Sequence, residues 1–246
     1  ASRSVPFVSK VTGVPWAKVA ARVMAGESLV ELAKLGIYGD ILCHRDYAKA
    51  IGRLDYVAIK QSVFPFIKFK GIDVVLGPEM RSTGEVMGID RSAQGGFYRA
   101  QIASSNSLPT SGTVFFSIRD GDKEEGAVLA KLLLTSGFKI LATKGTASYL
   151  KAQGLPVETI NKVRDGSPHI VDRLKAGGIC MVVNTPEGSG PHLDSRTIRS
   201  TATELRLPLF TTMAAAEAAI ESIAQVKKGA PLTVLSIQEY LKISNC

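Results

Sequence analysis

The chain has 246 residues, of which 45% are hydrophobic and 7% aromatic, and a formal net charge of +8 at pH 7. These values are those of a globular protein with one large or two small domains, and they exclude a disordered or coiled-coil chain. No apolar run reaches the roughly 18 residues of a membrane span, and the basic residues are scattered rather than gathered into a nucleic-acid-binding stripe. The sequence therefore predicts neither a membrane nor a nucleic-acid partner.

The cysteines are three in number and far apart, at Cys43, Cys180 and Cys246. They form no CxxC pair and no cluster with histidine, so neither a disulfide framework nor a metal site is predicted. We interpret them as thiols of a reducing compartment, which predicts a cytoplasmic protein.

The first part of the chain, residues 1–106, has an irregular pattern. Helices are predicted over 15–25 and 28–35, the second opened by a Ser-x-x-Glu capping box. A strand is predicted over 56–64, because β-branched and apolar residues end there at a proline. Glycines punctuate a short polar motif within 77–88, where no further element is predicted. Such a segment cannot close a core alone, so it is interpreted as the tail of a larger α+β domain.

The second part, residues 107–246, follows a linker rich in Ser, Pro and Gly at 104–112. Strands and helices then alternate. The strands are predicted over 113–119, 138–143, 156–160, 179–184 and 209–212, and the helices over 122–136, 146–153, 170–176, 194–205 and 214–225. Because the strands are apolar on both faces, we predict a doubly wound parallel sheet, a Rossmann-like three-layer α/β fold.

Polar residues follow four successive strands of this predicted sheet. Ligands of such sheets bind beyond the carboxyl ends of the strands. Hydroxyls, an amide and two lysines at one edge, with a helix N-terminus nearby, favour a phosphate group. Each residue alone could instead be a cap, a turn former or a solvated lysine. The predicted anion-binding residues are Ser117, Lys123, Thr143, Thr146, Lys162 and Asn184.

No catalytic set is predicted in this chain. The glycine-rich dinucleotide fingerprint and the Walker A motif are absent from the sequence. Glu79 and Glu85 form a carboxylate pair near Arg81, which could act as general acid and base or form an internal ion-pair network.

Several segments resemble the carbamoyl-phosphate synthase large subunit. They are ASRSVPFVSK at 1–10, KVAARVMAG at 18–26, LGPEMRSTGEVMG at 76–88 and DSRTIR at 194–199. The resemblance covers the C-terminal part of that subunit. It implies that residues 1–106 are the end of the second ATP-grasp domain with a connecting segment. It implies that residues 107–246 are the regulatory domain, with a methylglyoxal-synthase-like fold.

The resemblance implies an intact ligase that makes carbamoyl phosphate from bicarbonate, ATP and glutamine-derived ammonia, for arginine and pyrimidine synthesis. ATP, Mg or Mn and potassium would serve the intact enzyme, with a glutamine amidotransferase small subunit as partner and an oligomeric assembly. The ATP-binding and metal-binding residues of the family lie outside this sequence, so the chain alone is expected to bind none of these cofactors and to be inactive.

For the regulatory domain, the resemblance implies binding of a nucleotide effector such as UMP or IMP at the six residues predicted above. The sequence departs from many bacterial members at Pro186, where they have threonine. Members that respond to ornithine have glutamate and tyrosine at the positions of Gln61 and Leu209, so ornithine activation is not expected. Arg81 and Glu85 are candidates for coupling between the two parts.

Two rival functions follow from the same residues. A methylglyoxal synthase would need an Asp base at a strand end, where this chain has Asn184, and an amide cannot accept the proton. The other rival is a structural, subunit-contact domain that has lost its ligand.

Overall fold

The computed structural model describes residues 4–36, 54–68, 73–76, 80–185, 193–229 and 234–243. The predictions on Cys43, Cys246, Glu79 and Pro186 lie outside these residues. The described part begins with three short helices, α1 (Ser4–Thr12), α2 (Trp16–Met24) and α3 (Leu29–Lys34). The predicted capping box of α3 is confirmed, because Ser28 N donates to Glu31 Oε2 at 2.8 Å and Glu31 N donates to Ser28 Oγ at 3.2 Å.

An antiparallel pair of strands follows, β1 (Val57–Val63) and β2 (Gly84–Asp90), with a 3-10 turn η2 (Phe66–Lys68) between them. Helix α5 (Ala93–Ala103) packs on this pair. The sequence reading of 77–88 as a polar motif without an element was wrong for β2. Glycines are unfavourable within strands, but here Gly88 gives α5 room. A Cβ on Gly88 would lie 2.0 Å from the carbonyl oxygen of Gly96.

Within the described residues of the second part, five parallel strands form a sheet in the order β5-β4-β3-β6-β7. They are β3 (Thr113–Ser117), β4 (Lys139–Thr143), β5 (Val157–Ile160), β6 (Ile179–Asn184) and β7 (Leu209–Phe210). The connecting helices are α6 (Lys123–Thr135), α7 (Lys144–Ala152), α8 (Ile170–Lys175) and α9 (Leu193–Glu204), with α10 (Met213–Lys227) after β7 and 3-10 turns η3 (Asp120–Asp122) and η4 (Val163–Asp165). The predicted parallel α/β sheet is confirmed.

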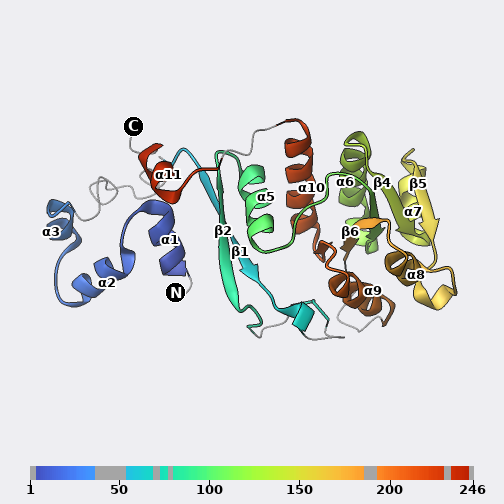
Figure 1. Cartoon of the computed structure of the whole chain (residues 1–246), viewed down its shortest axis with the longest axis horizontal. Helices are drawn as coiled ribbons and strands as arrows, with labels where there is room; N and C mark the ends of the chain where they lie inside the picture. The colour runs from blue at the N-terminus through green and yellow to red at the C-terminus, as the bar shows by residue number, and fades with distance from the viewer. Residues whose placement is uncertain are drawn as a thin grey trace.

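The helices cover the two faces of this sheet. Side chains alternate along β3, so Val114 and Phe116 pack in the core with α6, α7 and α10, while Phe115 packs in the core with α8 and α9. Helix α10 also packs against α5, which joins the β1–β2 pair to the larger unit. Figure 1 shows the resulting elongated order, from α2 and α3 at one end, through β1–β2, α5 and α10, to the parallel sheet.

The last described helix, α11 (Ile237–Ile243), returns to the first part of the chain beside α1 (Figure 1). Tyr240 OH donates to the carbonyl oxygen of Ile89 at 3.1 Å, and its ring lies 5.5 Å from that of Tyr56. Tyr240 thus packs with residues of the first part of the chain.

Among the described residues, no helix combines the length and hydropathy needed to cross a membrane. The same residues contain no group of three or more His, Cys, Asp or Glu side chains arranged to hold a metal ion.

Candidate functional site

The candidate site lies at the reversal point of the parallel sheet. From β3 the chain proceeds outward through β4 and β5, then returns to the other side of β3 with β6 and β7. The carboxyl ends of β3 and β6 are therefore neighbours whose following loops diverge, which is where open α/β sheets bind ligands. Ser117, the last residue of β3, is the register partner of Asn184, the last residue of β6.

Three hydroxyl side chains form a buried cluster at this point. Thr143 Oγ1, at the end of β4, lies 3.4 Å from Ser117 Oγ and 3.5 Å from Thr146 Oγ1 in the first turn of α7. Thr146 Oγ1 also accepts a hydrogen bond from Ile118 N at 3.3 Å. Residues from three elements that were predicted separately are thus brought within contact.

Asn184 is buried beside these hydroxyls, with both polar atoms of its side chain bonded. Its Nδ2 donates to the carbonyl oxygen of Ser117 at 3.2 Å. Its Oδ1 accepts from Nη1 of Arg199, on α9, at 2.9 Å. The amide orientation is therefore fixed. Next to it, Thr185 Oγ1 accepts from Arg119 N at 3.0 Å.

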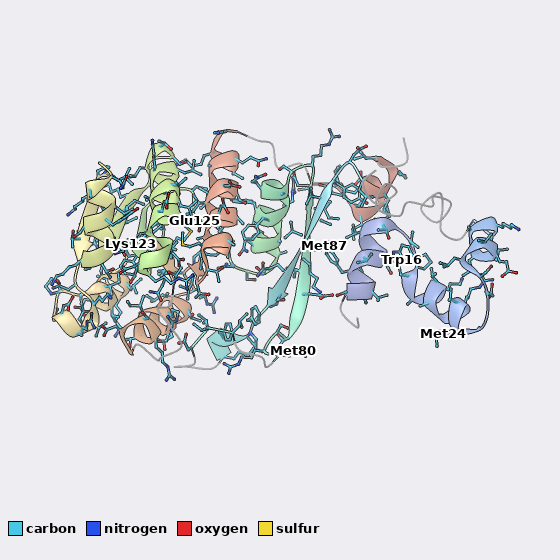
Figure 2. All side chains as sticks on the ribbon, turned by 180° about the vertical axis from the view of Figure 1, so that it is seen from behind. Trp16, Met24, Met80, Met87, Lys123 and Glu125 are labelled. Carbon is cyan, nitrogen blue, oxygen red and sulfur yellow. The ribbon has the colours of Figure 1, made fainter. Side chains whose placement is uncertain are left out.

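Lys123 is the first residue of α6 and is labelled in Figure 2. Its Nζ is 2.7 Å from Asp120 Oδ1 and 3.8 Å from the position that a Cβ on Gly145 would take. Gly145 belongs to the first turn of α7, whose free N–H groups favour an anion. The absence of a side chain there leaves the backbone of that turn open to a group bound by Lys123.

The carboxylate of Asp120 interacts with the two predicted lysines, by a contact with Lys123 and by the charges of Lys123 and Lys162. The pKa of Asp120 lies below its usual value, first because Lys123 donates a hydrogen bond to it, and further because of the charges of Lys123 and Lys162. The Asp120 side chain is 85% exposed. The charges of Lys123 and Lys162 thus both act on Asp120. That the two lysines hold one ligand together stays a prediction.

Arg199 and Asp120 are site residues that the sequence reasoning missed. Arg199 is buried on α9 and pairs with Asp73, 126 positions earlier in the chain, and no local pattern links two such positions. The acidic residues after β3 were visible in the sequence, but only the structure shows that Asp120 pairs with Lys123.

A separate cavity of about 410 Å³ lies between the β1–β2 pair with α5 and the edge of the parallel sheet at β7. Gln61 and Leu209 both line it. Among the described residues that line it there is no Asp or Glu, and Arg206 contributes a positive charge.

Glu85 lies in β2, where it pairs with Lys60 of the neighbouring strand at 3.1 Å. Arg81 lies in the segment before β2. A coupling role for these two residues stays a prediction.

The parallel sheet of the second part belongs to an MGS-like domain, as comparison with a family model shows. The family model of the MGS-like domain matches residues 125–211. This range includes most of the parallel sheet and four of the six predicted anion-binding residues.

Comparison with known proteins extends the similarity to nearly the whole chain. The carbamoyl phosphate synthase large chain of Gemmatimonas aurantiaca is 45% identical over 99% of this chain, which covers 21% of that protein. That of Ralstonia nicotianae is 46% identical over 91% of this chain and 19% of its own length. A shorter large chain from Methanosarcina barkeri is 41% identical over 98% of this chain and 57% of its own length.

The chain is therefore homologous to the C-terminal region of carbamoyl phosphate synthase large chains. It spans about a fifth of the length of the first of these relatives.

Proposed function

We propose that this chain is the regulatory end of a carbamoyl phosphate synthase large chain, and that its MGS-like domain binds a nucleoside monophosphate such as UMP or IMP. The observation that carries the proposal is the convergence of three buried hydroxyls and the Asn184 amide near the reversal point of the sheet. Lys123 lies beside the first turn of α7, and the charge of Lys162 adds to that of Lys123 at Asp120. The proposed contacts are Ser117, Lys123, Thr143, Thr146, Lys162 and Asn184.

The chemistry of these groups suits a phosphate dianion. Hydroxyls and backbone N–H groups donate hydrogen bonds, and ammonium groups supply charge. Each charge-assisted hydrogen bond contributes about 1.5–3 kcal/mol. Four or five of them, less the cost of association, are consistent with a binding free energy of about −8 kcal/mol, or micromolar affinity.

For the intact protein we propose the synthesis of carbamoyl phosphate from bicarbonate, ATP and ammonia released by a glutamine amidotransferase subunit. ATP, Mg or Mn and potassium would act in the intact enzyme. The resemblance puts the ATP-binding and metal-binding residues of the family outside this sequence. We therefore expect this chain alone to bind none of these groups and to form no carbamoyl phosphate from bicarbonate, ammonia and ATP.

A methylglyoxal-synthase-type lyase activity is disfavoured by the geometry at Asn184. A lyase needs a base at this strand end, and here the amide accepts from Arg199 and donates to Ser117. Incubation with dihydroxyacetone phosphate is expected to give no turnover.

Titration calorimetry of the full chain tests the proposal, with UMP, IMP, orthophosphate and the phosphate-free nucleoside uridine as probes. We expect heat of binding with at least one nucleotide and none with uridine. A flat titration with all four probes, together with an unchanged melting temperature, would favour the structural, ligand-free alternative.

A further inference from the structure

Arg199 connects the candidate anion site to the first part of the chain. Its guanidinium donates through Nη1 to Asn184 Oδ1 at 2.9 Å and through Nε to Asp73 Oδ1 at 2.7 Å, while Nη2 pairs with the other oxygen of Asp73. The arginine side chain is 5% exposed. A buried guanidinium needs a charged partner, so Arg199 cannot leave Asp73 without a large cost.

Asp73 belongs to the segment 73–76, which lies outside the parallel sheet. Burial by itself raises the pKa of Asp73, but the hydrogen bonds and charge of Arg199, the Val75 N–H and the charge of Arg196 together lower it below its usual value. Asp73 is therefore held ionised against Arg199. Val74 and Leu76 of the same segment line the cavity between the two parts of the chain.

We propose that Arg199 is a positioning residue that couples occupancy of the anion site to the segment 73–76. This inference rests on the proposed function. The Asn184 amide has a second Nδ2 hydrogen that it can donate to a ligand. A ligand held there restrains the side chain further and, through the bond from Arg199 to Oδ1, restrains the guanidinium and Asp73. The planar guanidinium makes this coupling possible, because it can bind the Asp73 carboxylate through two nitrogens and the Asn184 amide through the third.

Coupling of this kind is reciprocal. If the bound ligand stabilises the Arg199–Asp73 pair, the pair must favour the ligand by the same factor. Couplings between sites are typically about 5- to 150-fold in affinity, so an effect of at least about fivefold is expected in both directions.

Hydrogen exchange of the full chain, with and without saturating UMP, tests the link. The Val75 N–H donates to Asp73 Oδ1 at 3.3 Å and reports on the position of this carboxylate. In the unmodified chain, UMP is expected to slow exchange in 73–76 by about fivefold or more. In Arg199→Lys, which keeps the charge but lacks the planar guanidinium, UMP is expected to slow exchange at Ser117 and Asn184 but not in 73–76.

Affinity measurements test the reverse effect, that of the Arg199–Asp73 pair on UMP binding. Asp73→Asn is expected to weaken UMP binding by about fivefold or more, and to have no further effect in the Arg199→Lys background. Asp90→Asn is the matched control, because it weakens the comparable Arg99–Asp90 pair, at 2.9 Å, away from the site. This control is expected to bind UMP like the unmodified chain.

The outcomes separate this inference from the proposed function. If UMP binds but leaves exchange in 73–76 unchanged, and Asp73→Asn binds with unmodified affinity, the link is refuted and nucleotide binding stands. If UMP, IMP and orthophosphate all fail to bind the unmodified chain, both are refuted. If Arg199→Lys does not fold, as judged by circular dichroism, the exchange result in the unmodified chain and the affinity of Asp73→Asn decide.

Discussion

Replacing Lys123 by glutamine is expected to weaken the binding of a nucleoside monophosphate while leaving the fold intact. The Lys123 side chain is 17% exposed, and its Nζ lies 2.7 Å from the exposed carboxylate of Asp120, beside the open turn at Gly145. The substitution keeps the length of most of the side chain but removes its positive charge. A ligand phosphate would lose one charge-assisted hydrogen bond.

The size of the effect follows from that bond. A charge-assisted hydrogen bond contributes about 1.5–3 kcal/mol, which corresponds to about 10- to 150-fold in the dissociation constant. The ligand must displace Asp120 from Lys123, so part of the gain is already offset in the unmodified chain. The expected loss therefore lies at the lower end, about tenfold.

Titration calorimetry with UMP at fixed ionic strength measures this change. Lys131→Gln is the matched control, because Lys131 is an exposed lysine on the same helix, eight residues further along, and its loss changes the net charge equally. Asp120→Asn is expected to act in the opposite direction and tighten binding, because it removes the carboxylate that competes for Lys123 and Lys162. Equal affinities for Lys123→Gln and Lys131→Gln would refute the reasoning.

Three further predictions concern stability and specificity. Gly88→Ala is expected to lower the free energy of unfolding, measured with denaturant, by about 1–3 kcal/mol, because the new methyl group would overlap the carbonyl oxygen of Gly96. An unchanged free energy of unfolding would contradict the close packing of α5 on β2. The Asp73 carboxyl, with a lowered folded-state pKa, stabilises the chain above its unfolded pKa of about 3.9, and this contribution is lost as pH falls through the folded value. The melting temperature of the unmodified chain should therefore exceed that of Asp73→Asn at pH 6, and the difference should shrink by pH 3. Ornithine at millimolar concentration is expected to cause no shift in melting temperature. The described residues that line the cavity include the positively charged Arg206 but no carboxylate to bind its amino groups. A saturable shift would contradict this prediction.

In the first part of the chain, the sequence predicted a helix and a capping box but not strand β2. The helix at 16–24 and the capping box of α3 were predicted because each depends on a few neighbouring residues. Strand β2 was missed because its glycines oppose a strand locally. At Gly88 the missing side chain allows the close approach of α5, an arrangement between elements that periodicity does not encode.

The sequence by itself determined the alternation of buried strands and helices in the second part, and it placed hydroxyls, an amide and lysines at the strand ends. These features are local, because burial on both faces and the residue after a strand are written in consecutive positions. The tertiary structure alone decided that β3 lies beside β6, which pairs Ser117 with Asn184. It also decided that Arg199 reaches Asp73, 126 residues away. Strand order and such long-range pairs result from the packing of the whole chain, in which the burial of one charged group requires a partner that sequence distance does not reveal.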